Sequence, residues 1–286
     1  MSKTRTTDGK GMKKGIPFSK LNGSGNDFLL IDNRSGIMDG VDLPEFVEKV
    51  CDRSRSIGAD GVILIEKSRR ADFRWQFFNA DGSRAEMCGN GGRCAARFAV
   101  ERKIAPRDLG FETTAGLIKA EVANRRVKLQ MTVPRGLALS RTLSLGGRKM
   151  IYSFLDTGVP HAVLFVPDLE KVDVMGTGRG IRTHRAFAPR GTNVDFVQVK
   201  DGAVLVRTYE RGVEGETLAC GTGAVAAGII SCLHGYAIPP VPVRTRGGEI
   251  LTIHFDPKKK GFGEVCLEGD TSWSCDGKIF DEAYRY

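Results

Sequence analysis

The chain has 286 residues, of which 41% are hydrophobic and 27% charged. This is the composition of an ordinary globular protein, with enough length for two medium-sized domains. No apolar run approaches the roughly 18 residues of a membrane-spanning helix, so we expect no membrane association. The formal net charge is +9, but residues 1–15 alone supply +4 of it. Because the remaining charge is spread out, nucleic-acid binding is not expected.

The cysteines and the N-terminus indicate the compartment. Seven cysteines are too few and too scattered for a disulfide scaffold, and their spacing, like that of the four histidines, does not match a zinc site. Residues 1–17 are basic and lack the apolar segment of a secretory signal, so we expect them to form a disordered tail. These features predict a cytoplasmic protein without a metal ion.

Short apolar or alternating runs, separated by Gly, Asp and Asn, predict strands along most of the chain. In order they are Phe28–Ile31, Val62–Ile65, Phe73–Phe78, Leu117–Val122, Val127–Thr132, Ala162–Val166, Val194–Val199, Ala203–Tyr209 and Ile250–Phe255. Helices are fewer, at Leu43–Arg53, Gly91–Val100 and Ala224–Leu233. The last is almost wholly apolar, which predicts that it is packed on all sides.

Two similar stretches precede the later helices: MCGNGGRC at Met87–Cys94 and ACGTGAVA at Ala219–Ala226. The two leading cysteines, Cys88 and Cys220, lie 132 residues apart, and superimposing them aligns the glycines and the strands upstream. A strand, a loop, Cys-Gly-x-Gly and a buried helix therefore occur once in each half. This repeat predicts two similar domains, with a chance coincidence of glycines as the alternative.

The paired motifs have a clear chemical use. The first N–H groups of a helix lack internal partners and carry partial positive charge, so each motif can hold a carboxylate or phosphate. A cysteine at this position has a stabilised thiolate and is a candidate acid or base. If the domains face each other, two thiols flank one carbon, which is the arrangement that inverts a stereocentre. A lone cysteine before glycines is usually only a small buried residue, but two equivalent ones favour catalysis.

A dinucleotide site is the competing interpretation of the second motif, because Gly221–Ala226 matches G-x-G-x-x-A. That fingerprint requires a strand immediately before it and an acidic residue about twenty positions later. Neither feature is present, and the chain has no P-loop motif. We therefore expect no cofactor.

Several stretches together resemble the diaminopimelate epimerase family. They are FSKLNGSGNDFLLID (18–32), IGADG (57–61), FFNADGSRAEMCGNGGRCAARF (77–98), GVPHAV (158–163), GTNVDF (191–196) and YERGVEGETLACGTGAVAA (209–227). The resemblance implies an α+β fold of two pseudo-symmetric domains, each a curled, mainly antiparallel, barrel-like sheet around a central helix. It also implies cofactor-independent interconversion of LL- and meso-diaminopimelate, in lysine and peptidoglycan precursor synthesis.

The resemblance carries roles to matching positions. It implies that Cys88 and Cys220 are the acid/base pair, with His161 and Glu210 beside them. Gly89, Asn90, Gly221 and Thr222 would surround the reacting carboxylate, and Asn26, Asn79, Asn193 and Arg211 would hold the distal end, with Glu210 also contacting substrate. One position departs from the family pattern: Val159 replaces an Asn that contacts the distal end. Other groups or water compensate there, or the substrate differs.

The repeat and the resemblance also divide the chain. We expect an N-terminal half of residues 18–132 carrying Cys88 and completed by residues 276–286, and a C-terminal half of residues 133–275 carrying Cys220. The substrate is expected to be a small molecule, and the assembly stays open, with a homodimer among the alternatives. Racemisation of proline, hydroxyproline or histidine on the same scaffold and a non-catalytic small-molecule binder are the competing functions; retention of both cysteines disfavours the latter.

Overall fold

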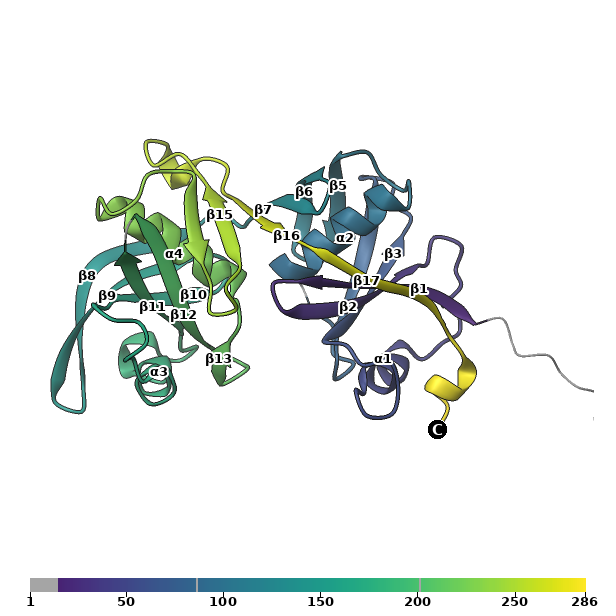
Figure 1. Ribbon diagram of the computed structural model, residues 1–286, viewed down its shortest axis with the longest axis horizontal. Coiled ribbons are helices and arrows are strands. Elements are labelled where there is room, and N and C mark those ends of the chain that lie inside the picture. Colours follow the sequence, from purple (N-terminus) through teal and green to yellow (C-terminus); the bar gives the residue numbers. More distant parts are fainter. Residues whose placement is uncertain (1–14, 86, 201) are drawn as a thin grey trace, which may run out of the picture.

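The computed structural model describes residues 15–85, 87–200 and 202–286, which form two lobes of β-sheet with one long helix inside each (Figure 1). Most of the expected basic tail, residues 1–14, lies outside the described residues. The first strand begins at Ile16, inside the segment expected to be tail, because the Ile16 side chain is buried and pairs with Ile279 near the C-terminus.

The N-terminal lobe contains seven consecutive strands. They are β1 (Ile16–Gly23), β2 (Asn26–Asp32), β3 (Gly61–Glu66), β4 (Phe73–Asn79), β5 (Asp108–Thr113), β6 (Gly116–Ala123) and β7 (Arg126–Gln130). Neighbours pair in this order, antiparallel except for the parallel pairs β2–β3 and β4–β5. Two helices belong to this lobe, α1 (Leu43–Cys51) and α2 (Gly89–Glu101).

The C-terminal lobe repeats this arrangement. Its strands are β8 (Arg135–Leu145), β9 (Arg148–Asp156), β10 (Pro160–Phe165), β11 (Asn193–Lys200), β12 (Ala203–Glu210), β13 (Gly215–Thr217), β14 (Val241–Arg244), β15 (Ile250–His254) and β16 (Cys266–Asp270). The parallel pairs are now β10–β11 and β12–β14, at the places equivalent to those of the first lobe. The helices are α3 (Val174–Arg182) and α4 (Gly221–Leu233), and 3₁₀ turns occupy Arg185–Phe187 and Lys260–Phe262. A further 3₁₀ turn near the C-terminus, Asp281–Ala283, lies on the N-terminal lobe.

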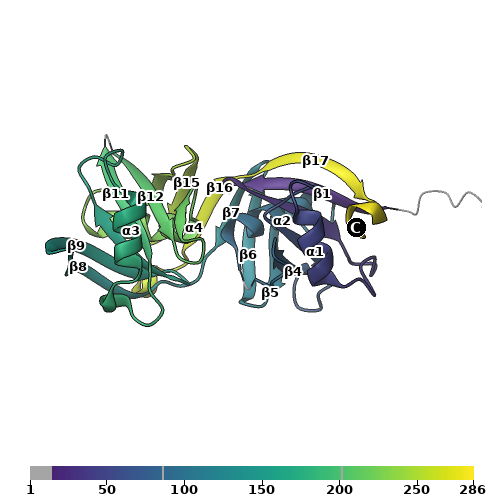
Figure 2. The ribbon, with the colours of Figure 1, turned by 90° about the horizontal axis from the view of Figure 1, so that it is seen from below.

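The chain crosses between the lobes twice, and the two crossings lie side by side. β7 pairs antiparallel with β16, which joins the two sheets, and β17 (Ser272–Ile279) then returns to pair with β1 (Figure 2). We propose that the N-terminal half is completed from Ser272 onward, four residues earlier than expected from the sequence, because the pairing with β1 begins at this residue.

The two central helices, α2 and α4, are mostly buried, because each is enclosed by the sheet of its own lobe. In α4 the residues Gly223–Ser231 are all buried, and α2 is buried over most of its length. The sheet is therefore curled around each helix, as the resemblance implied. By contrast, α1 is amphipathic and covers the outer side of β1–β3; its start is capped by the Asp42 carboxylate, which accepts the Glu45 N–H.

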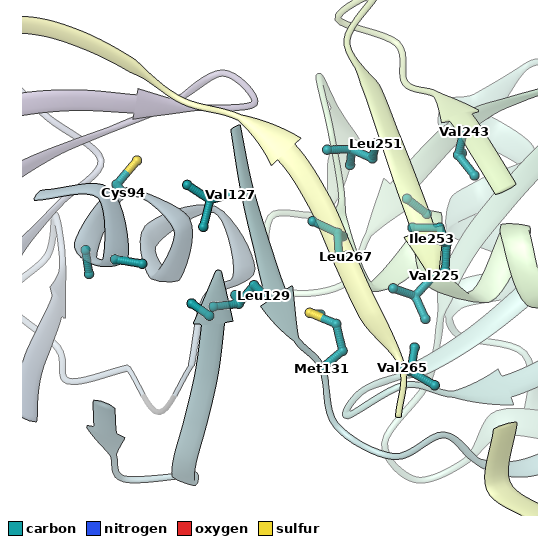
Figure 3. Packing of buried hydrophobic residues seen from close by; sticks show 14 of the residues in the cluster. Cys94, Val127, Leu129, Met131, Val225, Val243, Leu251, Ile253, Val265 and Leu267 are labelled. Atoms are coloured by element: carbon teal, nitrogen blue, oxygen red, sulfur yellow. The ribbon is translucent and has the colours of Figure 1, made fainter. Parts of the chain in front are cut away.

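One apolar cluster runs through both lobes by way of the paired strands. Figure 3 shows Val127 and Leu129 of β7 on the side of α2, with Val225 of α4 and Ile253 on the other side of β16. All four side chains are fully buried. The two lobes therefore share a continuous core instead of being connected by a flexible linker. No helix among the described residues is long and apolar enough to cross a membrane.

Each strand and helix predicted from the sequence is present, with ends shifted by at most three residues. The elements that the sequence analysis did not predict include the long hairpin β8–β9, the strands β16 and β17, and helix α3. Most side chains of β8 are exposed, although Leu137, Leu139, Leu143 and Leu145 follow the alternation of a half-buried strand, a signal that the sequence analysis did not use. In β9 the apolar residues fall on both faces, which hides the alternation. The prediction of two similar α+β halves is confirmed.

Candidate active site

The two motif cysteines occupy equivalent places in the fold. Cys88 is the N-cap residue of α2 and Cys220 that of α4, and both helices have 13 residues. The Cys88 sulfur accepts the Gly91 N–H at 3.4 Å, whereas Cys220 Sγ lies 3.4 Å from Thr222 Oγ1. All seven cysteines are unpaired. The helix starts expected from the sequence are thus present, one in each lobe.

Both thiols line one cavity of about 630 Å³ between the lobes. Most of the expected site residues line it as well: Asn26, Asn79, Gly89 and Asn90 from the N-terminal lobe, and Glu210, Gly221 and Thr222 from the C-terminal lobe. Val159 also faces the cavity, beside Thr157 and Gly158. Apolar side chains close another part of the wall, namely Phe28, Phe77, Met87, Ile118 and Met131. A small ligand of mixed character fits such a lining.

On the Cys88 side, a chain of polar groups fixes the amides at the cavity wall. Asn90 Nδ2 donates to Asn26 Oδ1 at 2.8 Å, and Asn26 Nδ2 donates to Asp60 Oδ2 at 3.0 Å. The other oxygen of Asp60 accepts a hydrogen bond from Arg53 at 2.8 Å. Each amide is therefore held in one orientation by its neighbours.

On the Cys220 side, a buried pair lies beneath the helix start. His161 Nδ1 is 2.7 Å from Asp195 Oδ2 and its Nε2 is 3.0 Å from Thr222 Oγ1, the hydroxyl that contacts the Cys220 sulfur. His161 and Asp195 are both fully buried. His161 therefore does not line the cavity; it reaches the site through Thr222, and Asp195 orients its ring.

Gly223 makes room for this pair, because a Cβ there would lie 2.5 Å from Asp195 Oδ1. At the equivalent Gly91 the neighbouring atoms are apolar, Ile63 Cδ1 at 3.3 Å and Phe28 Cζ at 3.5 Å. The two halves thus share a backbone arrangement but differ in the side chains at the helix start. The His161–Asp195 pair lies next to Gly223, whereas apolar side chains lie next to Gly91.

Glu210 lies at the end of β12 and lines the cavity, with Oε2 accepting the Thr217 hydroxyl at 3.0 Å. Burial raises the pKa of the Glu210 carboxyl, while Thr217 and the nearby His161 oppose the rise. Asn79 lines the N-terminal wall and donates to Ser83 Oγ at 3.0 Å.

Asn193 and Arg211 do not line the cavity. Asn193 is buried, where it donates to the Pro160 carbonyl at 3.1 Å and accepts the Arg211 backbone N–H at 2.7 Å. The Arg211 side chain donates to the Arg190 carbonyl at 3.2 Å, at the surface. In this structure both residues shape the turn that carries Glu210.

Burial dominates the ionisation of both thiols. It raises the pKa of Cys88, although the N–H groups of Gly91 and Asn90 and the Arg93 charge act in the opposite direction. It raises the pKa of Cys220 further, with Glu210 and Asp195 adding to the effect. The N–H groups at each helix start thus act in the direction expected from the sequence, but desolvation outweighs them.

Two acidic residues of the site were not identified from the sequence. Asp195 interrupts the apolar run Val194–Val199, and a single acid inside a buried strand is a signal that could have revealed it. Asp60 has no comparable signal, since it precedes a strand in a turn. Among the described residues, no group of three or more His, Cys, Asp or Glu side chains could hold a metal ion.

Solved structures define the fold class. The chain matches a phenazine biosynthesis protein of the PhzF family from Bacillus anthracis with a TM-score of 0.70, at 14% identity over 93% of this chain and 99% of that one. It matches a hydroxyproline epimerase from Agrobacterium vitis with a TM-score of 0.65, at 16% identity over 94% of both chains. By fold, the protein is one of these two-lobed, epimerase-like proteins.

Sequence comparison narrows the class to one family. The chain belongs to the diaminopimelate epimerase family, whose model matches residues 18–137 and 153–273. It is 50% identical to the diaminopimelate epimerase of Aquifex aeolicus over 95% of this chain and 100% of that protein. It is 44% identical to that of Archaeoglobus fulgidus over 94% of this chain and 96% of that protein. The family resemblance noted in the sequence is confirmed.

Proposed function

We propose that the protein is a cofactor-independent isomerase that converts LL-diaminopimelate to meso-diaminopimelate by two-base chemistry, in lysine and peptidoglycan precursor synthesis. The observation that carries the proposal is the pair of thiols, each at the N-cap of a buried helix, on the two sides of one cavity. The names of relatives that share nearly the whole length of the chain support the choice of substrate.

The reacting carboxylate would bind between the two helix starts. There the backbone N–H groups of the first turns of α2 and α4 offer partial positive charge from both lobes. One cysteine, as thiolate, removes the α-proton, and the other, as thiol, supplies a proton to the opposite face. Negative charge that develops toward the carboxylate is stabilised by the same N–H groups.

The other residues would act around this pair. Asn90 and Thr222 lie next to the two helix starts, and Asp195 and His161 position Thr222. We assign Asn26, Asn79 and Glu210 to substrate binding, because their side chains line the cavity. Asn193 and Arg211 would contact the distal end of the substrate only if the turn at Arg211 moves, since both lie outside the cavity wall.

Val159 faces the cavity without any group that can donate a hydrogen bond from its side chain. The polar groups nearest in the lining, the Thr132 and Thr157 side chains, are candidates to compensate, directly or through water. The same valine is the observation that favours a second candidate function, racemisation of a smaller amino acid such as proline, hydroxyproline or histidine.

The test is incubation in deuterated water with LL- and meso-diaminopimelate, proline, hydroxyproline and histidine, with NMR detection of label at the α-carbon. We expect label in diaminopimelate alone. Label in one of the other amino acids instead would replace the proposed substrate, and no label in any of them would contradict the proposed chemistry.

We also propose a cytoplasmic location and a homodimer. Seven unpaired cysteines fit a reducing compartment. For the dimer, the support is β8, which among the described strands pairs only with β9 and carries the exposed side chains of Leu137 and Leu139. Light scattering of the purified protein tests the assembly: a mass of one chain at micromolar concentration would rule out a stable dimer.

A further inference from the structure

An arginine without a counter-charge is enclosed beneath the first turns of α2. Arg93 is fully buried and is the largest such side chain of the described residues. No carboxylate among the described residues forms an ion pair with it. At the equivalent position of α4 the chain has Val225, also fully buried. The charge is therefore a feature of one half of the pseudo-symmetric site and not of the fold.

The contacts of the guanidinium tie two segments together. Nη2 donates to Asn90 Oδ1 at 3.1 Å and to the hydroxyl of Ser24, in the turn between β1 and β2, and Nη1 lies 3.4 Å from the Gly89 carbonyl. Asn90 and Ser24 both line the cavity. Arg93 thus holds the start of α2 and the β1–β2 turn in place from behind the cavity wall.

The crossing strand β16 is built to admit this side chain. A Cβ at Gly269 would lie 2.6 Å from Leu251 Cδ2, 3.2 Å from Arg93 Nε and 3.3 Å from Arg93 Cζ, so glycine leaves space for both side chains. Arg93 Nε finds no hydrogen-bond acceptor among the described residues. Burial of a cation with an unsatisfied donor is less favourable than burial of an apolar side chain such as that of Val225. Stability alone therefore does not explain the arginine.

The ionisable groups that face Arg93 are Cys88, Cys94, Glu249 and Asp270. Burial raises the pKa of Cys94 to about 12, so this thiol stays neutral. The charges of Glu249 and Asp270 favour the protonated guanidinium, but neither carboxylate forms an ion pair with it. Of these four groups, Cys88 lines the cavity. The nearby Glu210 charge raises the pKa of the Cys88 thiol and so opposes its ionisation. Cys220 has no corresponding cation and faces Glu210 and Asp195.

We propose that Arg93 is a positioning residue of the reaction: it fixes Asn90 and Ser24 at the cavity wall, and its buried charge favours the anionic form of the Cys88 sulfur. The proposal rests on the proposed function for the meaning of Asn90 and Cys88.

The first experiment measures the charge effect without substrate. In a Cys220→Ser, Cys275→Ser background, iodoacetamide reacts with Cys88 over a range of pH, and mass spectrometry identifies the modified peptide. Arg93→Met is expected to move the midpoint upward by about one pH unit, which lowers the rate about tenfold at a fixed pH below the midpoint. Arg93→Lys keeps the charge and is expected to leave the midpoint close to that of the parent.

The second experiment measures positioning, in the chain with both catalytic cysteines. Lysine cannot reproduce the planar fork that reaches Asn90, Ser24 and Gly89 together. Arg93→Lys is therefore expected to lower kcat about tenfold with a smaller change in KM, the scale of losing one well-made hydrogen bond to a charged group in the transition state. Ser24→Ala removes one acceptor and is expected to lower kcat by a smaller factor, with the alkylation midpoint unchanged.

Phe98→Leu is the matched control, because Phe98 is buried on the same helix and contacts neither the cavity nor Arg93. It should leave the alkylation midpoint and kcat unchanged. A folded Arg93→Met variant with the parent's midpoint would overturn the charge effect, and a normal kcat in Arg93→Lys would overturn the positioning role. If Arg93→Met does not fold, Arg93→Lys and Ser24→Ala still decide the positioning role. Because alkylation needs no turnover, its outcome is independent of whether diaminopimelate is the substrate.

Discussion

A buried thiol with a raised pKa is a stronger base once it is ionised, and this suits the removal of a weakly acidic α-proton. In this protein desolvation raises the pKa of both Cys88 and Cys220, but the charged groups around the two thiols differ. The Asp195–His161 pair and Glu210 surround Cys220, whereas Arg93 lies behind Cys88. At the scale of residues, the site is therefore asymmetric although the backbone repeats.

Removing either thiol should remove epimerisation. For Cys88→Ala and for Cys220→Ala we expect turnover to fall by at least 10²–10⁴-fold, the contribution of a positioned acid or base, with the melting temperature nearly unchanged. Cys232→Ala is the control, since Cys232 is on α4 but does not line the cavity. Stereoinversion followed by circular dichroism gives the rate, and normal turnover in either motif variant would refute the two-base mechanism.

Asp27 links the β1–β2 hairpin to the segment after α1 and should contribute to stability in a pH-dependent way. Burial tends to raise the pKa of Asp27, but hydrogen bonds from Arg53 and Lys20 outweigh it and lower the pKa to about 2. Because the folded-state pKa is depressed, the stabilisation is complete above about pH 4 and is lost as the pH falls toward 2. Because Arg53 is more than half exposed, solvent screening reduces this stabilisation to about 1–2 kcal/mol.

We therefore expect Asp27→Asn to lower the free energy of unfolding by this amount at pH 7 and by progressively less between pH 4 and pH 2. Denaturant unfolding across this range measures the difference. A constant difference between the two proteins at all pH values would show that the ionic interactions of Asp27 do not stabilise the fold.

At the scale of elements, the two helix starts give a matched pair of substitutions. At Gly223 an added Cβ would lie 2.5 Å from Asp195 Oδ1, and at Gly91 the nearest atom is the end of the Ile63 side chain, at 3.3 Å. Gly223→Ala should therefore displace the Asp195–His161 pair, with a loss of about 1–3 kcal/mol in stability and a large loss of turnover. Gly91→Ala should be near neutral in stability, because alanine favours the helix and Ile63 can move.

Thermal unfolding together with turnover tests this pair. Equal losses in the two variants would mean that the crowding at Asp195 is not what Gly223 avoids. The same comparison explains why the glycines of the two motifs are not interchangeable: one admits a buried carboxylate and the other packs against hydrocarbon.

At the scale of the whole molecule, the site exists because the chain crosses between the lobes twice. β7 and β16 join the two sheets, and a shared apolar core holds the two helix starts on opposite sides of one cavity. The thiols are 132 residues apart in the chain and line one cavity only through this pairing.

Mild oxidation tests this placement. A diamide-type oxidant should inactivate the protein by linking Cys88 to Cys220, and a thiol reductant should restore activity, since disulfide exchange is reversible. Peptide mapping identifies the linkage, and a Cys275→Ser variant controls for the exposed cysteine. Inactivation without a Cys88–Cys220 linkage would show that the lobes do not bring the two sulfurs together.

The amino-acid sequence by itself determined the two-fold repeat, the buried strands and helices, and the paired motifs, because apolar periodicity and glycine placement are local properties of the chain. It could not reveal that β17 begins to pair with β1 at Ser272, that His161 contacts Thr222, or that Arg93 and Asp195 lie beneath opposite helix starts. These facts depend on strand register and on which side chains meet across 30 to 260 residues of chain. Only the assembled sheets decide those meetings, since burial, and with it every pKa in the site, is a property of the tertiary fold.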